Sequence, residues 1–359
     1  MEKNGQSLLK YQQVKAYLMQ KMEQGEISYG EKLPSENELA LQFKISRQTV
    51  RQAMGELENE GLIYKRQGKG TFRSYSRTVE GRNIALLTTY ISDYIFPSII
   101  RGVESVLSFA GYTLLLANTD NNKLKEAQHL ENLLQKNIAG LIVEPTKSAD
   151  ENINYRYYRE LEKRGIPYLM LHASYEDLEP AFIRMDDEKG GYLAANYLLE
   201  LGHRRIAGIF KIDDLQGVRR KQGFLSALAE FGVEINQELI GDYVTEQKSY
   251  YPYQFTKALL EKELKPTAIL CYNDQNALQV IEAIRDAHLQ VPEDLSVIGY
   301  DDSHLAVASE IKLTTIKHPK IEMGKQAACL LLDMLSGKIQ KPELVYEPEL
   351  VIRNSCRSL

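Results

Sequence analysis

The sequence contains little cysteine and no long hydrophobic run. Its three cysteines, Cys271, Cys329 and Cys356, are odd in number and far apart, which fits neither a disulfide framework nor a zinc site and is typical of a reducing compartment. No apolar run reaches the roughly 18–20 residues of a membrane helix. Residues 1–10 also lack the apolar stretch of a signal peptide, so we expect a cytoplasmic protein with no membrane partner.

Several catalytic motifs are missing as well. The chain has no Gly-x-Ser-x-Gly elbow, no His-x-x-x-His pair, no Walker sequence and no Rossmann fingerprint. We therefore expect no enzyme activity, no catalytic residue, no cofactor and no metal.

Length and charge divide the chain. Its 359 residues are too many for one ordinary core and predict two or three domains. Residues 1–77 carry 13 Lys and Arg against 9 Asp and Glu, whereas the remaining 282 residues carry 31 against 40. A small basic segment before a large acidic one indicates a polyanionic partner for the basic segment alone.

The basic segment is predicted to form three helices. The first ends near Gly25, Pro34 opens a short second helix, and Ser46 is a natural N-cap for a third that runs to about Glu60. On the third helix, apolar residues share one arc and polar residues the opposite one. The polar arc consists of Arg47, Gln48, Arg51 and Gln52. This arrangement is typical of a helix-turn-helix, whose second helix enters the DNA major groove by its N-terminal end.

A glycine-turn hairpin follows the third helix. Residues 62–66 and 71–73 are predicted strands, and their tip, residues 67–70, is basic and small enough for its backbone to approach a phosphate. A solvated helix face or hairpin would explain each piece alone. Their order, spacing and shared positive charge instead favour a unit that binds double-stranded DNA.

Residues 10–73 resemble the GntR-type winged-helix domains. The resemblance rests on Leu33-Pro34-Ser35-Glu36, Ser46-Arg47, Thr49-Val50-Arg51, Glu60-Gly61-Leu62 and Gly68-Lys69-Gly70-Thr71-Phe72. It implies that Glu36, two arginines of the third helix, Thr49 and the wing tip contact operator DNA. With the polar arc included, the expected DNA-binding residues are Glu36, Ser46, Arg47, Gln48, Thr49, Arg51, Gln67, Gly68, Lys69 and Gly70.

Residues 74–82 are polar and read as a linker, and from Asn83 onward apolar strands alternate with amphipathic helices. The predicted strands cover residues 84–88, 112–117, 140–143, 167–171, 206–210, 267–271 and 295–298. The predicted helices cover residues 97–110, 123–136, 191–201, 218–231 and 274–287. Such alternation favours parallel sheets flanked by helices, and the length favours two doubly wound lobes.

Ligands of such folds bind beyond the carboxyl ends of the strands. Aromatic, carboxylate, amide and guanidinium groups gather at these predicted ends. They suit sugar hydroxyls and sugar C–H faces, whereas a nucleotide phosphate would require a glycine-rich loop. The residue chemistry therefore predicts a small polyol, although a helix cap explains any single residue equally well, as for Asp274 and Asp302.

Residues 83–359 resemble the LacI/GalR effector domains, which are akin to periplasmic sugar-binding proteins. The resemblance rests on Leu201-Gly202-His203, Gly223-Phe224, Asn273-Asp274, residues 291–302 and Leu313-Thr314-Thr315-Ile316. It implies an α/β two-lobed fold with lobe 1 at about 83–187 and 319–346 and lobe 2 at about 188–318 and 348–359. Three crossings between the lobes are expected near Asp187, His318 and Glu347.

A GntR head on a LacI/GalR-type body resembles the arabinose-responsive repressors of Gram-positive bacteria, notably in residues 88–97 and 143–148. The resemblance implies a homodimeric repressor of arabinose-utilisation genes that L-arabinose releases from its operator. It also implies a dimer surface that includes the helix of Ile99, Val103 and Val106. The expected effector-binding residues are Tyr90, Asp93, Phe96, Glu144, His172, Arg220, Asn273 and Asp301.

Three alternatives stay open at this point. Some GntR heads are fused to aminotransferase-like enzymes, which would need a Schiff-base lysine and a longer chain, and a cofactor absorbance band would reveal one. A transport-type binding protein is opposed by the DNA-reading head and the missing signal peptide. A regulator of the same architecture could respond to another sugar, a phosphosugar or a purine, which calorimetry would distinguish.

Overall fold

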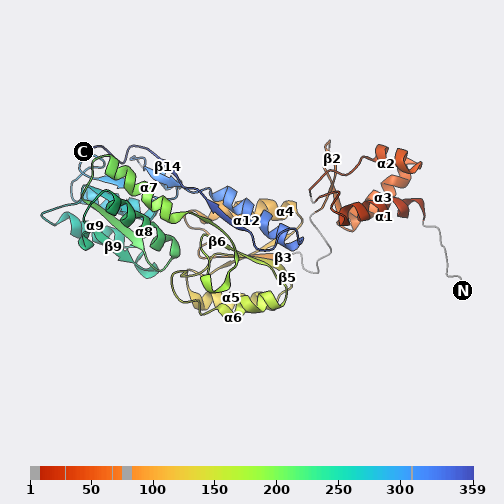
Figure 1. The fold of residues 1–359 in the computed structure, drawn as a ribbon, viewed down its shortest axis with the longest axis horizontal. Coiled ribbons are helices and arrows are strands. Elements are labelled where there is room, and N and C mark those ends of the chain that lie inside the picture. Colours follow the sequence, from red (N-terminus) through yellow and green to blue (C-terminus); the bar gives the residue numbers. More distant parts are fainter. Residues whose placement is uncertain (1–8, 29, 67, 75–82, 309) are drawn as a thin grey trace. The chain divides into compact units, whose positions relative to one another are not determined.

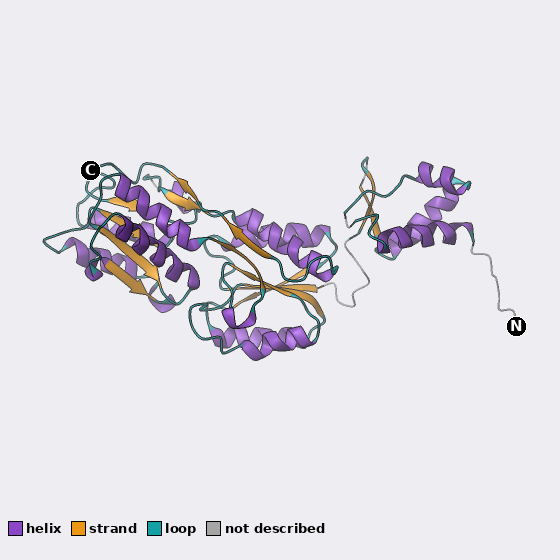
Figure 2. Ribbon diagram, in the orientation of Figure 1, coloured by secondary structure: helices purple, strands orange, loops and turns teal. Residues whose placement is uncertain are grey.

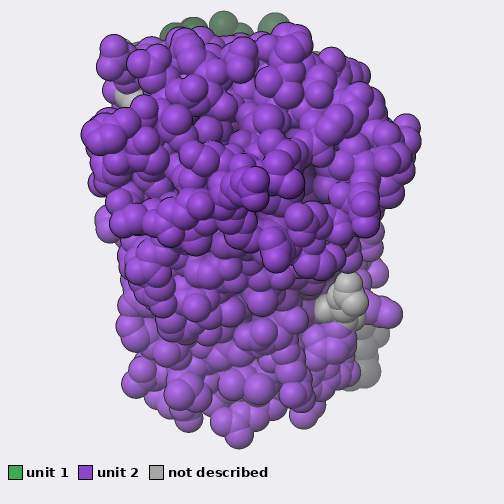
Figure 3. Space-filling view, turned by 90° about the vertical axis from the view of Figure 1, so that its left-hand side faces the viewer, with its two compact units in different colours: residues 1–82, 107–113 green, residues 83–106, 114–359 purple. Residues whose placement is uncertain are grey.

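The computed structural model describes residues 9–28, 30–66, 68–74, 83–308 and 310–359. The chain divides into a smaller unit, residues 1–82 with 107–113, and a larger unit, residues 83–106 with 114–359 (Figures 1 and 3). Gln67 and residues 75–82 of the expected linker lie outside the described residues. Within the described ranges, no helix combines the length and apolar character needed to cross a membrane.

The smaller unit contains three helices and a hairpin. The helices are α1 (Lys10–Glu23), α2 (Glu36–Phe43) and α3 (Arg47–Asn59), and the antiparallel strands are β1 (Ile63–Arg66) and β2 (Gly70–Arg73). The side chains of Ser35 and Ser46 accept hydrogen bonds from backbone N–H groups in the first turns of α2 and α3, which fixes where both helices begin. The apolar arc of α3, including Val50 and Leu57, is buried against α1 and α2.

Lobe 1 of the larger unit is built on a six-stranded sheet with the order β13-β7-β6-β5-β3-β4. Its strands are β3 (Asn83–Thr88), β4 (Thr113–Asn118), β5 (Ile138–Val143), β6 (Tyr168–Leu171), β7 (Ala181–Met185) and β13 (Glu343–Tyr346). Helices α4 (Phe96–Phe109) and α12 (Lys320–Leu335) cover one face, and α5 (Lys123–Leu134) and α6 (Tyr155–Lys163) cover the other (Figures 1 and 2).

Lobe 2 is built on a four-stranded sheet with the order β11-β10-β8-β9. Its strands are β8 (Ile206–Lys211), β9 (Ile240–Tyr243), β10 (Ala268–Cys271) and β11 (Ser296–Ile298), followed by the short helix α11 (Leu305–Ala308). Along β8, Ile206 and Phe210 pack on α7 (Asp187–Glu200) and α8 (Leu215–Glu230), whereas Ala207 and Ile209 pack on α9 (Tyr251–Leu260) and α10 (Asp274–Asp286). This alternation explains why the strand is apolar throughout.

The chain passes between the two lobes at three places. It leaves β7 at Met185 to begin α7 in lobe 2, and it leaves β12 (Thr315–Lys317) to begin α12 in lobe 1. It then leaves β13 at Tyr346 to form β14 (Glu349–Val351), which pairs antiparallel with β12. Asp187, His318 and Glu347 lie at these passages.

Two glycines allow α7 and α8 to cross closely. A Cβ atom on Gly191 would lie 2.1 Å from the backbone oxygen of Arg220, and one on Gly223 would lie 1.9 Å from the backbone oxygen of Glu188. No side chain fits at either position without moving a backbone. The crossing therefore sets the distance between Arg220 on α8 and Asp187 on α7.

The helix expected in the dimer surface, α4, has one buried face and one exposed face. Ile99 and Val103 are 1% and 0% exposed, because α4 packs against α12 with Gly102 and Gly324 at the crossing. These two side chains belong to the core of lobe 1. Val106 is half-buried, and Arg101 and Glu104 of the same helix are exposed, so a dimer surface that includes α4 stays a prediction.

Candidate functional site

The structure brings together Glu36 and the two arginines of the α3 polar face. Arg51 donates to the Glu36 carboxylate from Nη2 at 3.0 Å, and Arg47 Nη2 lies 3.8 Å from the same carboxylate. The hydrogen bond from Arg51 holds the pKa of Glu36 below its usual range. Both arginine side chains remain more than 60% exposed. Glu36 thus positions both guanidinium groups while most of each side chain stays accessible to an anion or a base edge.

The other predicted residues of α3 lie at its N-terminus. Ser46 Oγ accepts a hydrogen bond from Thr49 N at 3.2 Å and lies 2.9 Å from Thr49 Oγ1. Gln48 is exposed in the same turn. This end of the helix therefore offers a guanidinium, an amide and two hydroxyl groups, which is the mixture that base edges and phosphates require.

The hairpin tip is formed by Gly68, Lys69 and Gly70, all exposed, and both glycines have positive φ. The side chain of Lys32 occupies the space beside Gly70 where a Cβ atom would lie. Two lysines, Lys32 and Lys69, therefore lie at or beside a turn of small residues. Gln67, the remaining predicted tip residue, lies outside the described residues.

All eight predicted effector residues line one cavity of about 420 Å³ in the larger unit. Tyr90, Asp93 and Phe96 follow β3, and the others come from strand ends and helices of both lobes. Asp274 does not line it: its carboxylate accepts hydrogen bonds from Ser303 N and Thr315 Oγ1. Further lining residues that the sequence analysis did not assign include Tyr94, Asp187, Lys211, Asp214, Tyr243, Lys248, Tyr272, Gln279 and His318.

A buried carboxylate–imidazole pair lies on the lobe 1 wall. Glu144 follows β5, and its Oε1 lies 2.8 Å from His172 Nδ1, which follows β6. Its other oxygen accepts hydrogen bonds from the Thr89 amide and hydroxyl. Burial alone would raise the pKa of Glu144, but the hydrogen bonds from His172 and Thr89 lower it. Burial would lower the pKa of His172, and Glu144 raises it.

Arg220 organises the lobe 2 wall. Its Nε donates to Asp187 Oδ1 at 2.8 Å, its Nη1 donates to the Tyr272 carbonyl at 2.7 Å, and its Nη2 lies 3.5 Å from Asp301 Oδ1. The guanidinium also lies 3.5 Å from the Tyr300 ring centroid. Burial raises the pKa of Asp187, although Arg220 opposes that shift. The guanidinium is thus held rigidly between two carboxylates that both line the cavity.

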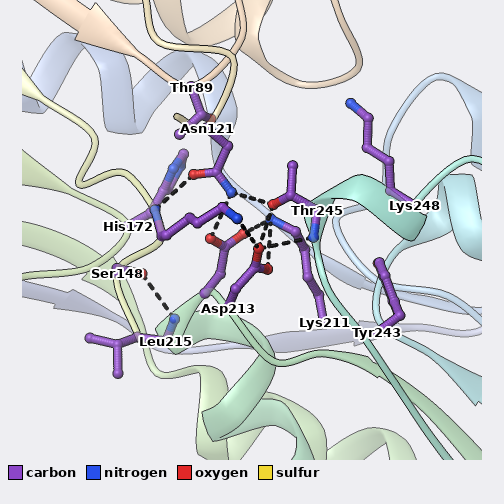
Figure 4. Close-up of polar contacts among 12 residues, drawn as sticks. Thr89, Asn121, Ser148, His172, Lys211, Asp213, Leu215, Tyr243, Thr245 and Lys248 are labelled. Atoms are coloured by element: carbon purple, nitrogen blue, oxygen red, sulfur yellow. Dashed lines mark hydrogen bonds and ion pairs between the residues drawn. The ribbon is translucent and has the colours of Figure 1, made fainter. Parts of the chain in front are cut away.

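Polar contacts join the two lobes beside the cavity. Asn121 of lobe 1 donates to Thr245 Oγ1 at 2.6 Å and to Asp214 Oδ1 at 3.2 Å, and the Leu215 amide donates to Ser148 Oγ at 2.9 Å (Figure 4). Tyr94 of lobe 1 donates to the Tyr300 carbonyl of lobe 2 at 2.9 Å. The structure therefore has the lobes closed over the cavity.

Several buried polar atoms of the cavity wall have no hydrogen-bond partner within the described part of the chain. They are Tyr90 Oη, His172 Nε2, Gln279 Oε1 and both ring nitrogens of His318. Buried polar atoms in proteins are nearly always paired, so unpaired donors and acceptors around one cavity indicate a ligand that is rich in hydrogen-bonding groups.

The charges of the wall disfavour an anionic ligand. Five carboxylates line the cavity against three lysine and arginine cations, Lys211, Arg220 and Lys248. Two of the cations are already paired, since Lys211 contacts Asp213 and Asp214 and Arg220 contacts Asp187. The third, Lys248, lies 3.8 Å from the Tyr90 ring centroid and 3.7 Å from Asp93. A neutral polyhydroxyl compound suits this wall better than a phosphate ester.

The lining residues that were not assigned from the sequence differ in whether a sequence pattern could have identified them. Asp214 lies at the start of α8, directly after a buried strand, so the rule of strand carboxyl ends covers it. Lys248 and Gln279 lie on a loop and within a helix, where their pattern is that of any exposed polar residue. Only the approach of separate elements in three dimensions identifies these two.

Comparison with known proteins agrees with both units. Residues 10–72 match the family described as "Bacterial regulatory proteins, gntR family", and residues 195–356 match the "Periplasmic binding protein-like domain". Among solved structures, the chain resembles a "transcriptional regulator CelR-cellobiose complex" (TM-score 0.67, 25% identity, 86% of this chain and 90% of that one). It also resembles a LacI family regulator from Enterococcus faecium with bound ribose (TM-score 0.67, 29% identity, 77% and 99%).

Full-length relatives match more strongly. The "Arabinose metabolism transcriptional repressor" of Geobacillus stearothermophilus is 47% identical over 98% of this chain and 99% of its own length. The repressor of the same name from Halalkalibacterium halodurans is 48% identical over 96% of both chains. These relatives are transcriptional repressors and not enzymes. This chain, with its GntR-type winged helix and its two-lobed periplasmic-binding-protein-like domain, belongs to the family of the arabinose metabolism transcriptional repressors.

Proposed function

We propose that this protein is a cytoplasmic, homodimeric repressor of arabinose-utilisation genes. It binds double-stranded operator DNA through its winged helix and leaves the operator when L-arabinose binds between the lobes. The observation that carries the proposal is the closed, net-acidic cavity, in which several buried polar atoms have no hydrogen-bond partner among the residues that the structure describes. Such a wall suits a neutral sugar, and the full-length relatives are named for arabinose metabolism.

The cavity supplies each contact that a pentose needs. Phe96 and Tyr90 offer ring faces and edges for sugar C–H groups, and their rings are 5.7 Å apart. Arg220, Asp301, Glu144, His172, Asn273 and Asp93 offer donors and acceptors for the hydroxyls. Asn273 Oδ1 caps α10 by accepting from Asn276 N, which leaves the Asn273 amide nitrogen for the ligand.

The operator contacts are assigned to one face of the smaller unit. Arg47, Gln48 and Arg51 read base edges, Ser46 and Thr49 contact phosphate, and Glu36 orients both arginines. The hairpin tip approaches the neighbouring backbone or minor groove. A single helix-turn-helix buries too little DNA surface for tight binding, so two copies read two half-sites of a palindrome.

Isothermal titration calorimetry on the full-length protein tests the effector assignment. The titrants are L-arabinose, its epimers, other pentoses, hexoses, a pentose phosphate and nucleobases. We expect L-arabinose to bind most tightly and an epimer to bind at least tenfold more weakly, because the wrong hydroxyl leaves buried wall groups unpaired. Tighter binding of a nucleobase or a phosphosugar would replace arabinose as the effector while leaving the DNA-binding role in place.

A further inference from the structure

His318 lies at the second passage between the lobes, immediately after β12. Its side chain is 4% exposed and lines the cavity, and neither ring nitrogen has a hydrogen-bond partner within the described residues. Its position is fixed through the backbone, since His318 N donates to the Asp301 carbonyl and its own carbonyl accepts from Lys320 N. An imidazole held in this way, with both nitrogens buried and unpaired, is placed to meet a ligand.

A second imidazole lies against it. The rings of His318 and His172 are 5.1 Å apart and nearly perpendicular, although they come from different lobe segments. Because His172 Nδ1 lies against the Glu144 carboxylate, which only accepts hydrogen bonds, that nitrogen carries a proton. Its Nε2 is buried and unpaired. Three unpaired imidazole nitrogens therefore belong to one wall of the cavity.

The charged groups around the two rings give them opposite charge states. His172 faces Glu144, Asp187 and Asp301, and these carboxylates, against the effect of burial, raise its pKa. No carboxylate raises the pKa of His318 in the same way. Burial lowers that pKa most, and the positive charges of His172, Lys320 and Arg220 add to the effect, so it lies well below 6.5. Near neutral pH, His172 is the ring that gains a proton and His318 is the ring that stays neutral.

We propose that His172 and His318 together receive one hydroxyl group of the bound sugar. Charged His172 donates to the hydroxyl oxygen through Nε2, and neutral His318 accepts the hydroxyl proton through a ring nitrogen. This assignment rests on the proposed function, because it takes the ligand to be a neutral polyhydroxyl compound. A sugar that lacks or inverts this hydroxyl leaves both imidazoles unpaired, so the pair is a determinant of sugar specificity.

Two variants of the full-length protein test the assignment by calorimetry with L-arabinose. His318→Leu keeps the volume of the side chain and removes the acceptor, and we expect it to weaken binding roughly tenfold to a hundredfold. His318→Gln keeps an acceptor and should weaken binding less. The matched control is His304→Gln, an exposed histidine of lobe 2 that does not line the cavity, and it should bind within about twofold of the parent.

Monodeoxy-arabinoses separate a direct contact from a structural role. In the parent, removal of the hydroxyl that meets the pair should cost about tenfold in affinity, whereas in His318→Leu the same removal should cost almost nothing. Operator binding without sugar should be unchanged in both variants. The parent should also bind arabinose more weakly as the pH rises through the raised pKa of His172, because the Nε2 donor is lost.

Two results would overturn the inference alone. The first is that the parent binds arabinose and the His318→Leu variant binds it with an affinity within twofold of the parent's. The other is an equal deoxy-sugar penalty in parent and variant for every position. If His318→Leu does not fold, the same deoxy series on His318→Ala, which also removes the acceptor, decides. A parent that binds no sugar overturns the proposed function and, with it, this inference.

Discussion

Arg220 is the residue on which the lobe 2 wall depends. It is 4% exposed and lies between Asp187 and Asp301, two buried carboxylates. Removal of one partner from a buried ion pair leaves the other charges uncompensated, which typically costs about 3–5 kcal/mol. The residue therefore stabilises the larger unit, in addition to its proposed role as a donor to the sugar.

We expect Arg220→Ala to abolish arabinose binding and to lower the thermal stability of the larger unit. Operator affinity without sugar should stay near normal, because the α3 residues are untouched. Calorimetry, thermal unfolding and gel-shift assays measure the three quantities. Arg219→Ala, at the neighbouring half-buried position outside the cavity wall, is the matched control. Arabinose binding by Arg220→Ala at the parent's affinity would show that the cavity is misassigned.

The Glu144–His172 pair makes stability depend on pH. Its hydrogen bond, against the effect of burial, lowers the pKa of Glu144 below 4.5 and raises the pKa of His172 above 6.5. The contribution of Glu144 is complete above pH 4.5 and is lost as the pH falls through its lowered pKa. The contribution of His172 is complete below pH 6.5 and is lost as the pH rises through its raised pKa.

Glu144→Gln should therefore lower the melting temperature of the larger unit most between pH 4.5 and 6.5. The difference from the parent should shrink at higher pH, where His172 is neutral in both proteins. Within the window the loss should correspond to about 1–3 kcal/mol. Glu347→Gln removes an exposed ion pair with Lys189 and should show no such window. An equal difference at every pH would mean that the pair is not charged.

Among the helices, α7 and α8 determine the geometry of the site. Gly191 and Gly223 let the two backbones touch, and this contact places Arg220 beside Asp187. In the sequence, Gly190-Gly191 is an isolated pair without the flanking pattern of a phosphate loop. Its role is in helix packing, which depends on the second helix and has no local sequence signal.

Gly223→Ala should destabilise the larger unit and weaken arabinose binding at least tenfold, since a Cβ atom there would lie 1.9 Å from a backbone oxygen. Gly55→Ala is the matched control: nothing lies within 4 Å of its Cβ position on α3. That substitution should stabilise the helix by about 0.5–1 kcal/mol. Thermal unfolding and calorimetry check both, and a Gly223→Ala protein with parental affinity would refute the packing argument.

The polar face of α3 predicts how substitutions change operator affinity. Arg51→Ala or Arg47→Ala should weaken operator binding by about 1–3 kcal/mol, the usual effect of losing a bidentate base contact. Arabinose affinity should not change. Lys10→Ala, an exposed lysine at the start of α1, should have a smaller effect. Gel-shift affinities at physiological salt measure this, and parental affinity in both arginine variants would contradict the assigned face.

The predicted and observed elements differ in an instructive way. The uninterrupted apolar runs became β3, β5, β6, β8, β10 and β11, because strands buried on both faces must be apolar throughout. Strands β7, β9, β12, β13 and β14 were not predicted. Residues 343–346 of β13, for instance, alternate exposed with half-buried residues at a sheet edge, and a charged first residue hides the pattern. An edge strand of this kind can be identified only when the neighbouring strand in the sheet is known.

The site shows the same contrast. All eight predicted effector residues line the cavity. Most follow strands, whose carboxyl ends meet at one edge of a parallel sheet, whereas Arg220 lies within α8 and was assigned through the family resemblance. His318 follows a three-residue strand, and as a lone histidine without metal spacing it had no pattern to reveal it. Tyr94 joins the lobes only because the loop after β3 meets the backbone of Tyr300, more than 200 positions later.

At the scale of the larger unit, closure of the lobes is the event that a ligand can control. Three residues of lobe 1 form direct hydrogen bonds with lobe 2, namely Tyr94, Asn121 and Ser148. These hydrogen bonds can form only when the lobes are close together. These contacts therefore stabilise the closed arrangement alone. In the proposed function, a sugar that binds both Glu144 of lobe 1 and Arg220 of lobe 2 would favour the same arrangement, so the sugar and the polar contacts would stabilise closure together.

Sugar binding can change DNA binding only through its different affinities for the open and closed arrangements, and the coupling is reciprocal. We expect saturating L-arabinose to lower operator affinity by about 1–3 kcal/mol, and operator DNA to weaken arabinose binding by the same factor. Fluorescence anisotropy of a labelled operator, with and without sugar, measures the first effect, and calorimetry on the complex measures the second.

Asn121→Ala sharpens this test, because it weakens the closed arrangement while removing no side chain that lines the cavity or lies on the polar face of α3. The variant should need several-fold more arabinose for release from the operator, and its operator affinity without sugar should equal the parent's or exceed it slightly. Asn132→Ala, an exposed asparagine on α5, should behave like the parent. Tighter operator binding with sugar would make the protein a co-repressed regulator or an activator. If arabinose left operator affinity unchanged in the parent, it would not be the effector, and a different ligand would control closure of the lobes.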